Sequence, residues 1–309
     1  MRIAAFDLGT NTFNLLVADA TENTYHEVYR DKKAVKLGHS GITKKVINDE
    51  AIERGVEAIR DCMKAIEPLN VDKILAVATS AIRSAENGVA FTKRLYKEFK
   101  LEVRIIGGDE EAELIYHGIR RAVPLSVENV LMLDIGGGSN EFIIANKNVI
   151  SWKQSFPLGI ARLLEMFKPS NPMTQEEAEN VIEFLDKELK PLKEIIPAYS
   201  LKRLVGSSGS FDTLANICNL INKQENQTPI ATFYKFDKTE IISLCIKLIS
   251  STIEERRQMK GMDMMRIEMI PLAAVFIKYI LEIINVEEVF QSSYAIKEGI
   301  VFSYSEVEN

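Results

Sequence analysis

The stretch LMLDIGGGSNEFIIA, residues 131–145, decides how the rest of this sequence is interpreted. An apolar strand reaches an acid, Asp134, is interrupted by three glycines, and is followed by a second apolar strand. Glycine is favoured where the backbone must approach another group closely, because no Cβ is in the way. The stretch therefore predicts a hairpin that holds a dinucleotide, a nucleotide phosphate or another phosphorylated ligand, or that is simply a tight turn.

Two known nucleotide motifs fit this stretch poorly. The G-x-G-x-x-G spacing of dinucleotide-binding folds is absent, and a strand rather than a helix follows the glycines. A P-loop would require Gly-Lys-Ser/Thr, and no lysine stands after the glycines. A plain turn explains one or two glycines but not Gly136, Gly137 and Gly138 together. A glycine-rich hairpin can present several N–H groups to one anion, with the Ser139 hydroxyl as a further donor, so phosphate binding is favoured.

A second copy of the pattern opens the chain. In FDLGTNTFNLLVA, residues 6–18, Asp7 precedes Asp134 by 134 − 7 = 127 residues. A repeat at this distance indicates a duplicated domain rather than a short-period solenoid. Two such hairpins facing each other across a cleft would bring backbone donors and two carboxylates to one polyanion. A cation such as Mg²⁺ would be needed to offset the repulsion between the carboxylates and the phosphates.

The pattern of elements predicts an α/β fold with two domains. Three strands and then alternating helices and strands follow residue 1, and the same order restarts after Pro124. The length of 309 residues is also typical of two domains. In the second half, Thr174 and Glu177 form a capping-box pattern at the start of an expected helix.

The composition indicates which kinds of partner and which cellular compartment to expect for this protein. The net charge of −6 argues against a protein that binds nucleic acid through its phosphate backbone. The three cysteines, Cys62, Cys218 and Cys245, form no CxxC and are expected to be buried thiols. The N-terminus reaches Asp7 without an apolar signal-peptide core, and no long uncharged apolar run follows. We expect a cytoplasmic protein with no membrane or nucleic-acid partner.

The paired hairpins resemble those of the actin-like ATPase superfamily, and five further stretches resemble the Ppx/GppA family of exopolyphosphatases and guanosine pentaphosphate phosphohydrolases. These stretches are ATSAIRSAENG (78–88), IIGGDEEAELIYHG (105–118), SFPLGIARLLEMF (155–167), VGSSGSFDTLA (205–215) and YAIKEGI (294–300). They cover nearly the whole chain in the family's order. The resemblance implies two actin-like (ribonuclease H-like) domains with mixed sheets and an interdomain cleft. It places domain I at residues 1–123 plus about 295–309, and domain II at residues 124–294.

The resemblance also implies roles for individual residues. Glu111 matches the catalytic base, and Asp134 and Arg83 match further catalytic residues. The implied phosphate-binding residues are Gly9, Asn11, Thr12, Gly136, Gly137, Gly138, Ser139, Gly206, Ser208 and Gly209. The implied metal ligands are Asp7, Asp134 and Glu141, for Mg²⁺ or alternatively Mn²⁺.

The implied reaction is hydrolysis of the terminal phosphoanhydride of inorganic polyphosphate, with guanosine pentaphosphate as the alternative substrate. The chain resembles the short, two-domain form of the family, and a homodimer is expected by analogy alone. A kinase of the same superfamily and a non-catalytic polyphosphate or alarmone sensor remain alternatives. Basic pairs such as Lys32 with Lys33 and Arg256 with Arg257 are mostly expected on solvated faces. The sequence does not decide which of them line a polyphosphate path.

Overall fold

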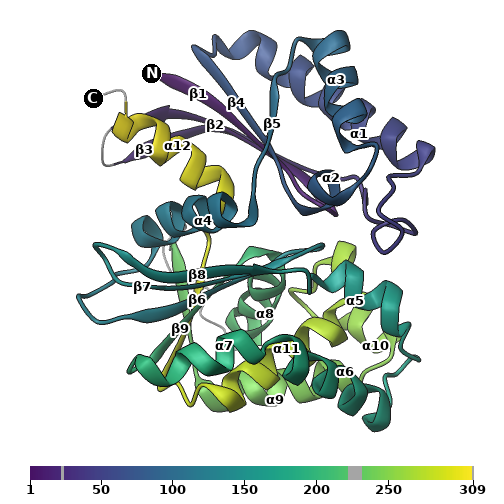
Figure 1. Cartoon of the computed structure of the whole chain (residues 1–309), viewed down its shortest axis with the longest axis vertical. Coiled ribbons are helices and arrows are strands. Elements are labelled where there is room, and N and C mark those ends of the chain that lie inside the picture. The colour runs from purple at the N-terminus through teal and green to yellow at the C-terminus, as the bar shows by residue number, and fades with distance from the viewer. Residues whose placement is uncertain (22–23, 222–231, 308–309) are drawn as a thin grey trace.

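Two mixed β-sheets with their helices form the two halves of the molecule (Figure 1). The computed structural model describes residues 1–21, 24–221 and 232–307. The predicted fold class, α/β with two actin-like domains, is confirmed, because both sheets begin with the same three antiparallel strands and place two further parallel strands beside the first of them. The second sheet adds an antiparallel strand at its edge.

The first sheet has the strand order β3-β2-β1-β4-β5. Its strands are β1 (Arg2–Leu8), β2 (Thr12–Ala20), β3 (Tyr25–Ala34), β4 (Lys73–Ala78) and β5 (Val103–Ile105). The pairs β1–β2 and β2–β3 are antiparallel, whereas β4 runs parallel to both β1 and β5.

The second sheet has the order β10-β11-β9-β6-β7-β8. Its strands are β6 (Val130–Ile135), β7 (Asn140–Ala145), β8 (Ile150–Phe156), β9 (Arg203–Ser207), β10 (Phe233–Phe236) and β11 (Glu288–Ser292). Here β6–β7 and β7–β8 are antiparallel and β9 is parallel to β6, which repeats the arrangement of the first sheet. The edge strand β10 was not expected from the sequence, because four residues are too few to show a pattern.

Helices flank both sheets. The α-helices are α1 (Asp49–Ile66), α2 (Ser80–Ser84), α3 (Gly88–Phe99), α4 (Gly108–Ala122), α5 (Ile160–Phe167), α6 (Gln175–Glu188), α7 (Lys190–Ile195), α8 (Ser208–Ile221), α9 (Lys238–Ser250), α10 (Ile253–Gln258), α11 (Ile270–Ile283) and α12 (Ile296–Val307), with short 3₁₀ helices at Glu67–Leu69, Ile196–Ala198 and Met264–Arg266. Both bonds of the predicted Thr174–Glu177 capping box are present at α6, which confirms that prediction. None of the described helices is both long and apolar enough to cross a membrane.

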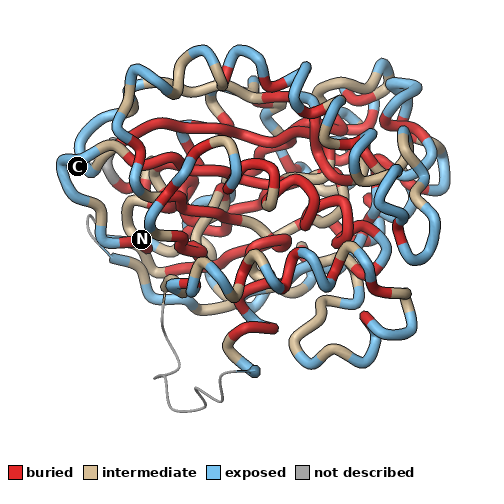
Figure 2. Tube along the Cα trace, turned by 90° about the horizontal axis from the view of Figure 1, so that it is seen from below, coloured by how far each residue is buried: buried red, intermediate tan, exposed pale blue. Residues whose placement is uncertain are grey.

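Two helices, α4 and α12, lie between the sheets and join the halves into one core (Figure 1). Their buried side chains, such as Ile115 and Val301, pack in one cluster with Ile3 of the first sheet and Met132 of the second. Two further apolar clusters lie within the separate halves. Figure 2 shows the buried segments running through the middle of the molecule, under an exposed outer layer.

The chain returns to its first half at the C-terminus. α12 packs against β1, β2 and α4, although the sequence places it after the second sheet. We therefore propose the domain division 1–123 plus about 295–309, and 124–294. Residues 308 and 309 of this proposed division lie outside the described part of the chain.

Candidate active site

The two hairpin turns, the first with one glycine and the second with three, face each other between the halves of the molecule. One joins β1 to β2 and the other joins β6 to β7. The register pairs Asp7 with Asn14 in the first hairpin and Asp134 with Glu141 in the second. Asn14 and Glu141 are again 141 − 14 = 127 residues apart, so the repeat extends to the partner of each acid.

The glycines of the second turn lie in close contact with the first hairpin. A Cβ on Gly137 would lie 2.9 Å from the Asn11 side chain, and one on Gly138 would lie 2.6 Å from the hydroxyl oxygens of Thr10 and Ser80. The sequence predicted that these glycines allow a close approach, and a facing hairpin is one group that they admit.

Backbone bonds to α5 orient the peptide groups of this turn. The carbonyl oxygens of Gly136 and Gly137 accept from the N–H groups of Ile160 (3.0 Å) and Ala161 (2.9 Å). Within the described residues, the N–H groups of Gly137 and Gly138 have no acceptor, and both glycines line a pocket. A turn whose carbonyls are engaged and whose N–H groups are free can bind an anion.

Replacing Gly138 with alanine is expected to separate the two hairpins. Its φ lies outside the left-handed region, so alanine can adopt this backbone, but the added Cβ would meet Thr10 and Ser80. We expect the free energy of unfolding to fall by about 1–3 kcal/mol, measured by urea denaturation, and activity to fall about 100-fold. Gly107→Ala is the matched control, because no atom lies within 4 Å of the added Cβ. Equal effects of the two substitutions would contradict this packing argument.

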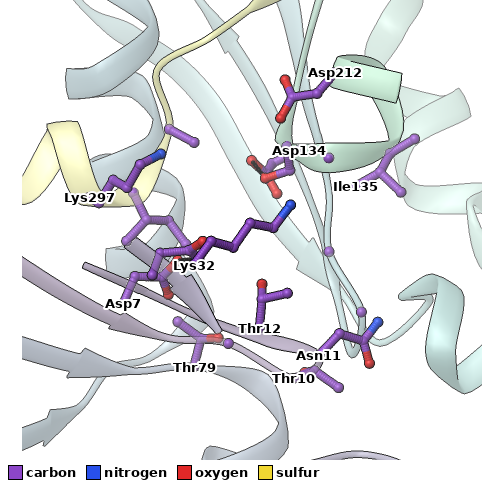
Figure 3. A pocket seen from close by; sticks show the side chains of 18 of the residues that line it. Asp7, Thr10, Asn11, Thr12, Lys32, Thr79, Asp134, Ile135, Asp212 and Lys297 are labelled. Atoms are coloured by element: carbon purple, nitrogen blue, oxygen red, sulfur yellow. Dashed lines mark hydrogen bonds between the residues drawn. The ribbon is translucent and has the colours of Figure 1, made fainter. Parts of the chain in front are cut away.

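The pocket between the hairpins has a volume of about 200 Å³. Most of the predicted site residues line it, and Figure 3 shows several of their side chains directed into it. The predicted residues that line it are Asp7, Gly9, Asn11, Thr12, Glu111, Asp134, Gly136, Gly137, Gly138, Ser139, Ser208 and Gly209. Arg83, Glu141 and Gly206 do not line it.

Asp7 and Asp134 are both buried at the pocket wall. Asp7 accepts a hydrogen bond from Asn14 at 2.9 Å through Oδ2, whereas its buried Oδ1 has no partner among the described residues. Burial raises the pKa of Asp7 to about 6, and the nearby Asp134 contributes to the rise. Asp134 accepts from the hydroxyls of Ser207 (2.7 Å) and Ser208 (2.6 Å), yet burial still raises its pKa. Two buried carboxylates facing one pocket are costly unless a cation binds near them.

Glu111 lies in the first turn of α4 and is 4 % exposed. Arg83, in the last turn of α2, donates to its Oε2 at 2.8 Å and to the carbonyl oxygen of Ile106 at 3.0 Å. Burial raises the pKa of Glu111 to about 7 although Arg83 opposes the rise, and Asp7 and Asp134 add to it. A carboxylate with a pKa near neutrality is suited to general-base chemistry.

Two of the predicted contact residues lie behind the pocket wall. Glu141 is 1 % exposed and accepts from the Ser155 hydroxyl at 2.7 Å. Burial is the main cause that raises the pKa of Glu141, and the negative charges of Glu111 and Asp134 raise it further. Gly206 packs under Phe211, because a Cβ there would lie 2.3 Å from that ring. These positions do not support the direct metal or phosphate contacts that the resemblance implied.

The carboxylates of the pocket suit a magnesium ion that is also bound by water and substrate, rather than a metal ion bound by protein ligands alone. No group of three or more His, Cys, Asp or Glu side chains in the described residues is arranged to hold a metal by itself. Mg²⁺ commonly uses only one or two carboxylates and takes its other ligands from water and substrate phosphates. The unpartnered Oδ1 of Asp7 and the nearby Asp134 meet that requirement.

Several lining residues were not identified from the sequence. Among them are Asn14, Arg30, Lys32, Asp212, Arg266 and Lys297. The 127-residue repeat could have indicated Asn14, and Lys297 stands inside the quoted stretch YAIKEGI. No sequence pattern distinguished Lys32 from its neighbour. Arg256, from a basic pair expected to be mostly solvated, is buried and donates to the carbonyl oxygen of Ile267 at 2.8 Å.

The fold and the pocket together define a two-domain, actin-like α/β protein with a pocket between its two halves, where two hairpin turns meet. The model of the Ppx/GppA phosphatase family matches residues 16–308. The chain therefore belongs to that family, as its motifs predicted.

Relatives and solved structures agree with this assignment. The chain is similar to an exopolyphosphatase of Cytophaga hutchinsonii whose structure is known, with 35% identity, a TM-score of 0.96, and coverage of 99% of this chain and 98% of that one. It is also similar to the Ppx/GppA family member of Aquifex aeolicus, with 25% identity, a TM-score of 0.83, and coverage of 100% and 99%.

A curated relative of Fusobacterium nucleatum, a bifunctional 3-dehydroquinate synthase/phosphatase, is 29% identical over 90% of this chain. The chain spans only 43% of the length of that protein. A putative exopolyphosphatase of Haemophilus influenzae is 26% identical over 97% of this chain and 90% of its own length.

Proposed function

We propose that this protein is an exopolyphosphatase, which hydrolyses the terminal phosphoanhydride of inorganic polyphosphate. The observation that carries the proposal is the buried Glu111, whose pKa is raised to about 7, at a pocket lined by the turns of two facing hairpins. The names of the relatives in Cytophaga and Haemophilus support the same substrate. We also expect a cytoplasmic location and, by family analogy, a homodimer.

The hairpins would hold the terminal phosphoryl group. The free N–H groups of Gly137 and Gly138 would donate to its oxygens, together with the Ser139 hydroxyl. Such donors stabilise the charge of a transferring phosphoryl group because they are already oriented before the reaction.

Glu111 would accept the proton of the attacking water. The water attacks the terminal phosphorus, the bond to the bridging oxygen breaks, and the shortened chain leaves with the electrons of that bond. The geometry favours a positioning role for Arg83 over the predicted contact with the transferring group, since Arg83 bonds to Glu111 and does not line the pocket. Mg²⁺, held by Asp7 and Asp134, would supply positive charge to the phosphate oxygens.

Phosphate release from a substrate panel tests the proposal. The panel contains polyphosphate, guanosine pentaphosphate, ATP and p-nitrophenyl phosphate, each with Mg²⁺, with Mn²⁺, and with EDTA. We expect polyphosphate to give the highest kcat/KM, with activity lost in EDTA and restored by excess metal. A preference for guanosine pentaphosphate would establish the alternative substrate. Phosphate transfer from ATP to an acceptor would indicate a kinase, and binding without turnover would indicate a sensor.

A further inference from the structure

We propose that Arg30, Lys32 and Lys297 form a subsite for the second and third phosphates of the substrate, those of the leaving group. This inference rests on the proposed function and assigns the part of the pocket beyond the reacting phosphoryl group. All three cations line the pocket, two of them on β3 and one at the start of α12. β3 and α12 are far apart in the sequence, and neither contains one of the two facing turns of the site.

A buried carboxylate holds two of these cations in place. Glu298 is completely inaccessible to solvent, and its Oε1 lies 3.0 Å from the Lys297 ammonium and 3.3 Å from the Arg30 guanidinium. Its Oε2 accepts from the backbone N–H of Ala295 at 2.9 Å, which fixes the carboxylate at the start of α12. Arg30 also pairs with Glu27 at 2.7 Å, so the two acids offset the two cations and hold them in fixed positions, to which a phosphate of the substrate can bind.

Lys297 extends toward the acids of the reaction site. Burial raises the pKa of Asp7, Asp134 and Asp212, and at all three residues the positive charge of Lys297 opposes that rise. In Figure 3 the Lys32 and Lys297 side chains extend into the pocket from different elements, toward Asp134. A phosphate next to the reacting phosphoryl group would therefore lie within reach of both ammonium groups.

The orientation of β3 explains why Lys32 belongs to this subsite and Lys33 does not. Successive side chains of a strand point to opposite faces. Lys32 lines the pocket and reaches Asp263 of the other half at 3.4 Å. Lys33 pairs instead with Asp31 (3.2 Å) and Asp61 (3.5 Å) and does not line the pocket.

The lining favours a linear polyphosphate over a nucleotide as the ligand of this subsite. Of the described residues that line the pocket, none is aromatic, so the lining offers no aromatic ring that could stack on a guanine base. Cations from two separate elements suit instead a chain of phosphates with a negative charge on each unit. The ligand class of the subsite is thus an inorganic chain of at least two phosphates beyond the one that is cleaved.

Equilibrium binding to the Glu111→Gln protein tests the subsite without turnover. Calorimetry with tripolyphosphate and with orthophosphate, both in Mg²⁺ buffer, compares this protein with versions that also carry Lys32→Gln or Lys297→Gln. We expect each lysine substitution to weaken tripolyphosphate binding by about 10-fold or more, and orthophosphate binding by less than about 2-fold. Lys33→Gln is the matched control and is expected to leave both affinities unchanged, because its side chain lies on the other face of β3.

The outcomes separate this proposal from the proposed function. Equal weakening for tripolyphosphate and orthophosphate, or an equal effect of Lys33→Gln, would overturn the subsite. Tripolyphosphate binding that depends on Lys32 and Lys297, in a wild-type protein that releases no phosphate, would support the subsite and overturn the hydrolase. Lys32→Gln keeps the test decisive if Lys297→Gln destabilises the fold, because the Lys32 side chain is 36% exposed and contacts no buried acid.

Discussion

Replacing Glu111 with glutamine is expected to lower phosphate release from polyphosphate by about 10³- to 10⁴-fold. Glutamine has nearly the same shape and can still accept the hydrogen bond from Arg83, but it cannot take a proton from water. The loss should appear in kcat more than in KM, since Glu111 acts on the attacking water and not on the phosphate chain. Steady-state kinetics with polyphosphate of one chain length measures both constants.

The matched control for this substitution is Glu110→Gln, in the same turn of α4. Glu110 forms an ion pair with Arg104 and does not line the pocket, so its replacement should change activity less than about 2-fold. If Glu111→Gln retained activity and Glu110→Gln lost it, Glu110 and not Glu111 would be the general base.

The pH dependence gives a second measure of the role of Glu111. Its pKa is raised to about 7, so the carboxylate needed as a base forms only as the pH rises through that value. We expect kcat/KM of the wild-type protein to increase as the pH rises through about 7, where it reaches half of its maximum, and to level off above that pH. Bound Mg²⁺ favours the charged form and should shift this limb to lower pH. The limb should vanish in Glu111→Gln.

Replacing Asp134 with asparagine is expected to lower activity by about 10²- to 10³-fold without unfolding the protein. The asparagine oxygen can still accept from the Ser207 and Ser208 hydroxyls, but the negative charge that faces the metal is lost. Because burial raises the pKa of Asp134, its charged form costs stability as the pH rises through that pKa. The asparagine protein should therefore be as stable as the wild type, or more stable, near neutral pH in the absence of metal.

Thermal unfolding with and without Mg²⁺ separates the two effects of this substitution. Mg²⁺ with polyphosphate should raise the unfolding temperature of the wild-type protein and leave that of Asp134→Asn almost unchanged. Asp237→Asn is the control, since Asp237 caps α9 away from the pocket and asparagine is an equally good cap. An Mg²⁺-induced rise that persists in Asp134→Asn would argue against Asp134 as a ligand.

The repeat was the part of this protein most open to prediction from the sequence. Asp7 and Asp134 stand at equivalent places because the same local pattern, an apolar strand with an acid near its end, forms the same hairpin twice. The start of α6 was equally predictable, since the Thr174–Glu177 capping box depends only on residues three apart. Elements too short to show a period, such as β10, could not be predicted in this way.

Position within a stretch did not reveal which side chains reach the pocket. Gly206 and Glu141 belong to motifs of the site, yet one packs under an aromatic ring and the other lies behind the pocket wall. Arg83 is held by Glu111 across 111 − 83 = 28 residues of sequence, a separation with no local signature.

The duplicated α/β architecture, the two facing hairpins and the acids that accompany them could all be predicted from the sequence, because they depend on local spacing and periodicity. The three-dimensional arrangement was needed to show that the glycines of DIGGGS admit the facing hairpin, and that Lys32 rather than Lys33 enters the pocket. It also placed Lys297, near the end of the chain, beside acids of both hairpins. Close packing and the grouping of charges depend on which distant segments of the chain meet in the fold. The local sequence around a residue does not indicate which segments those are.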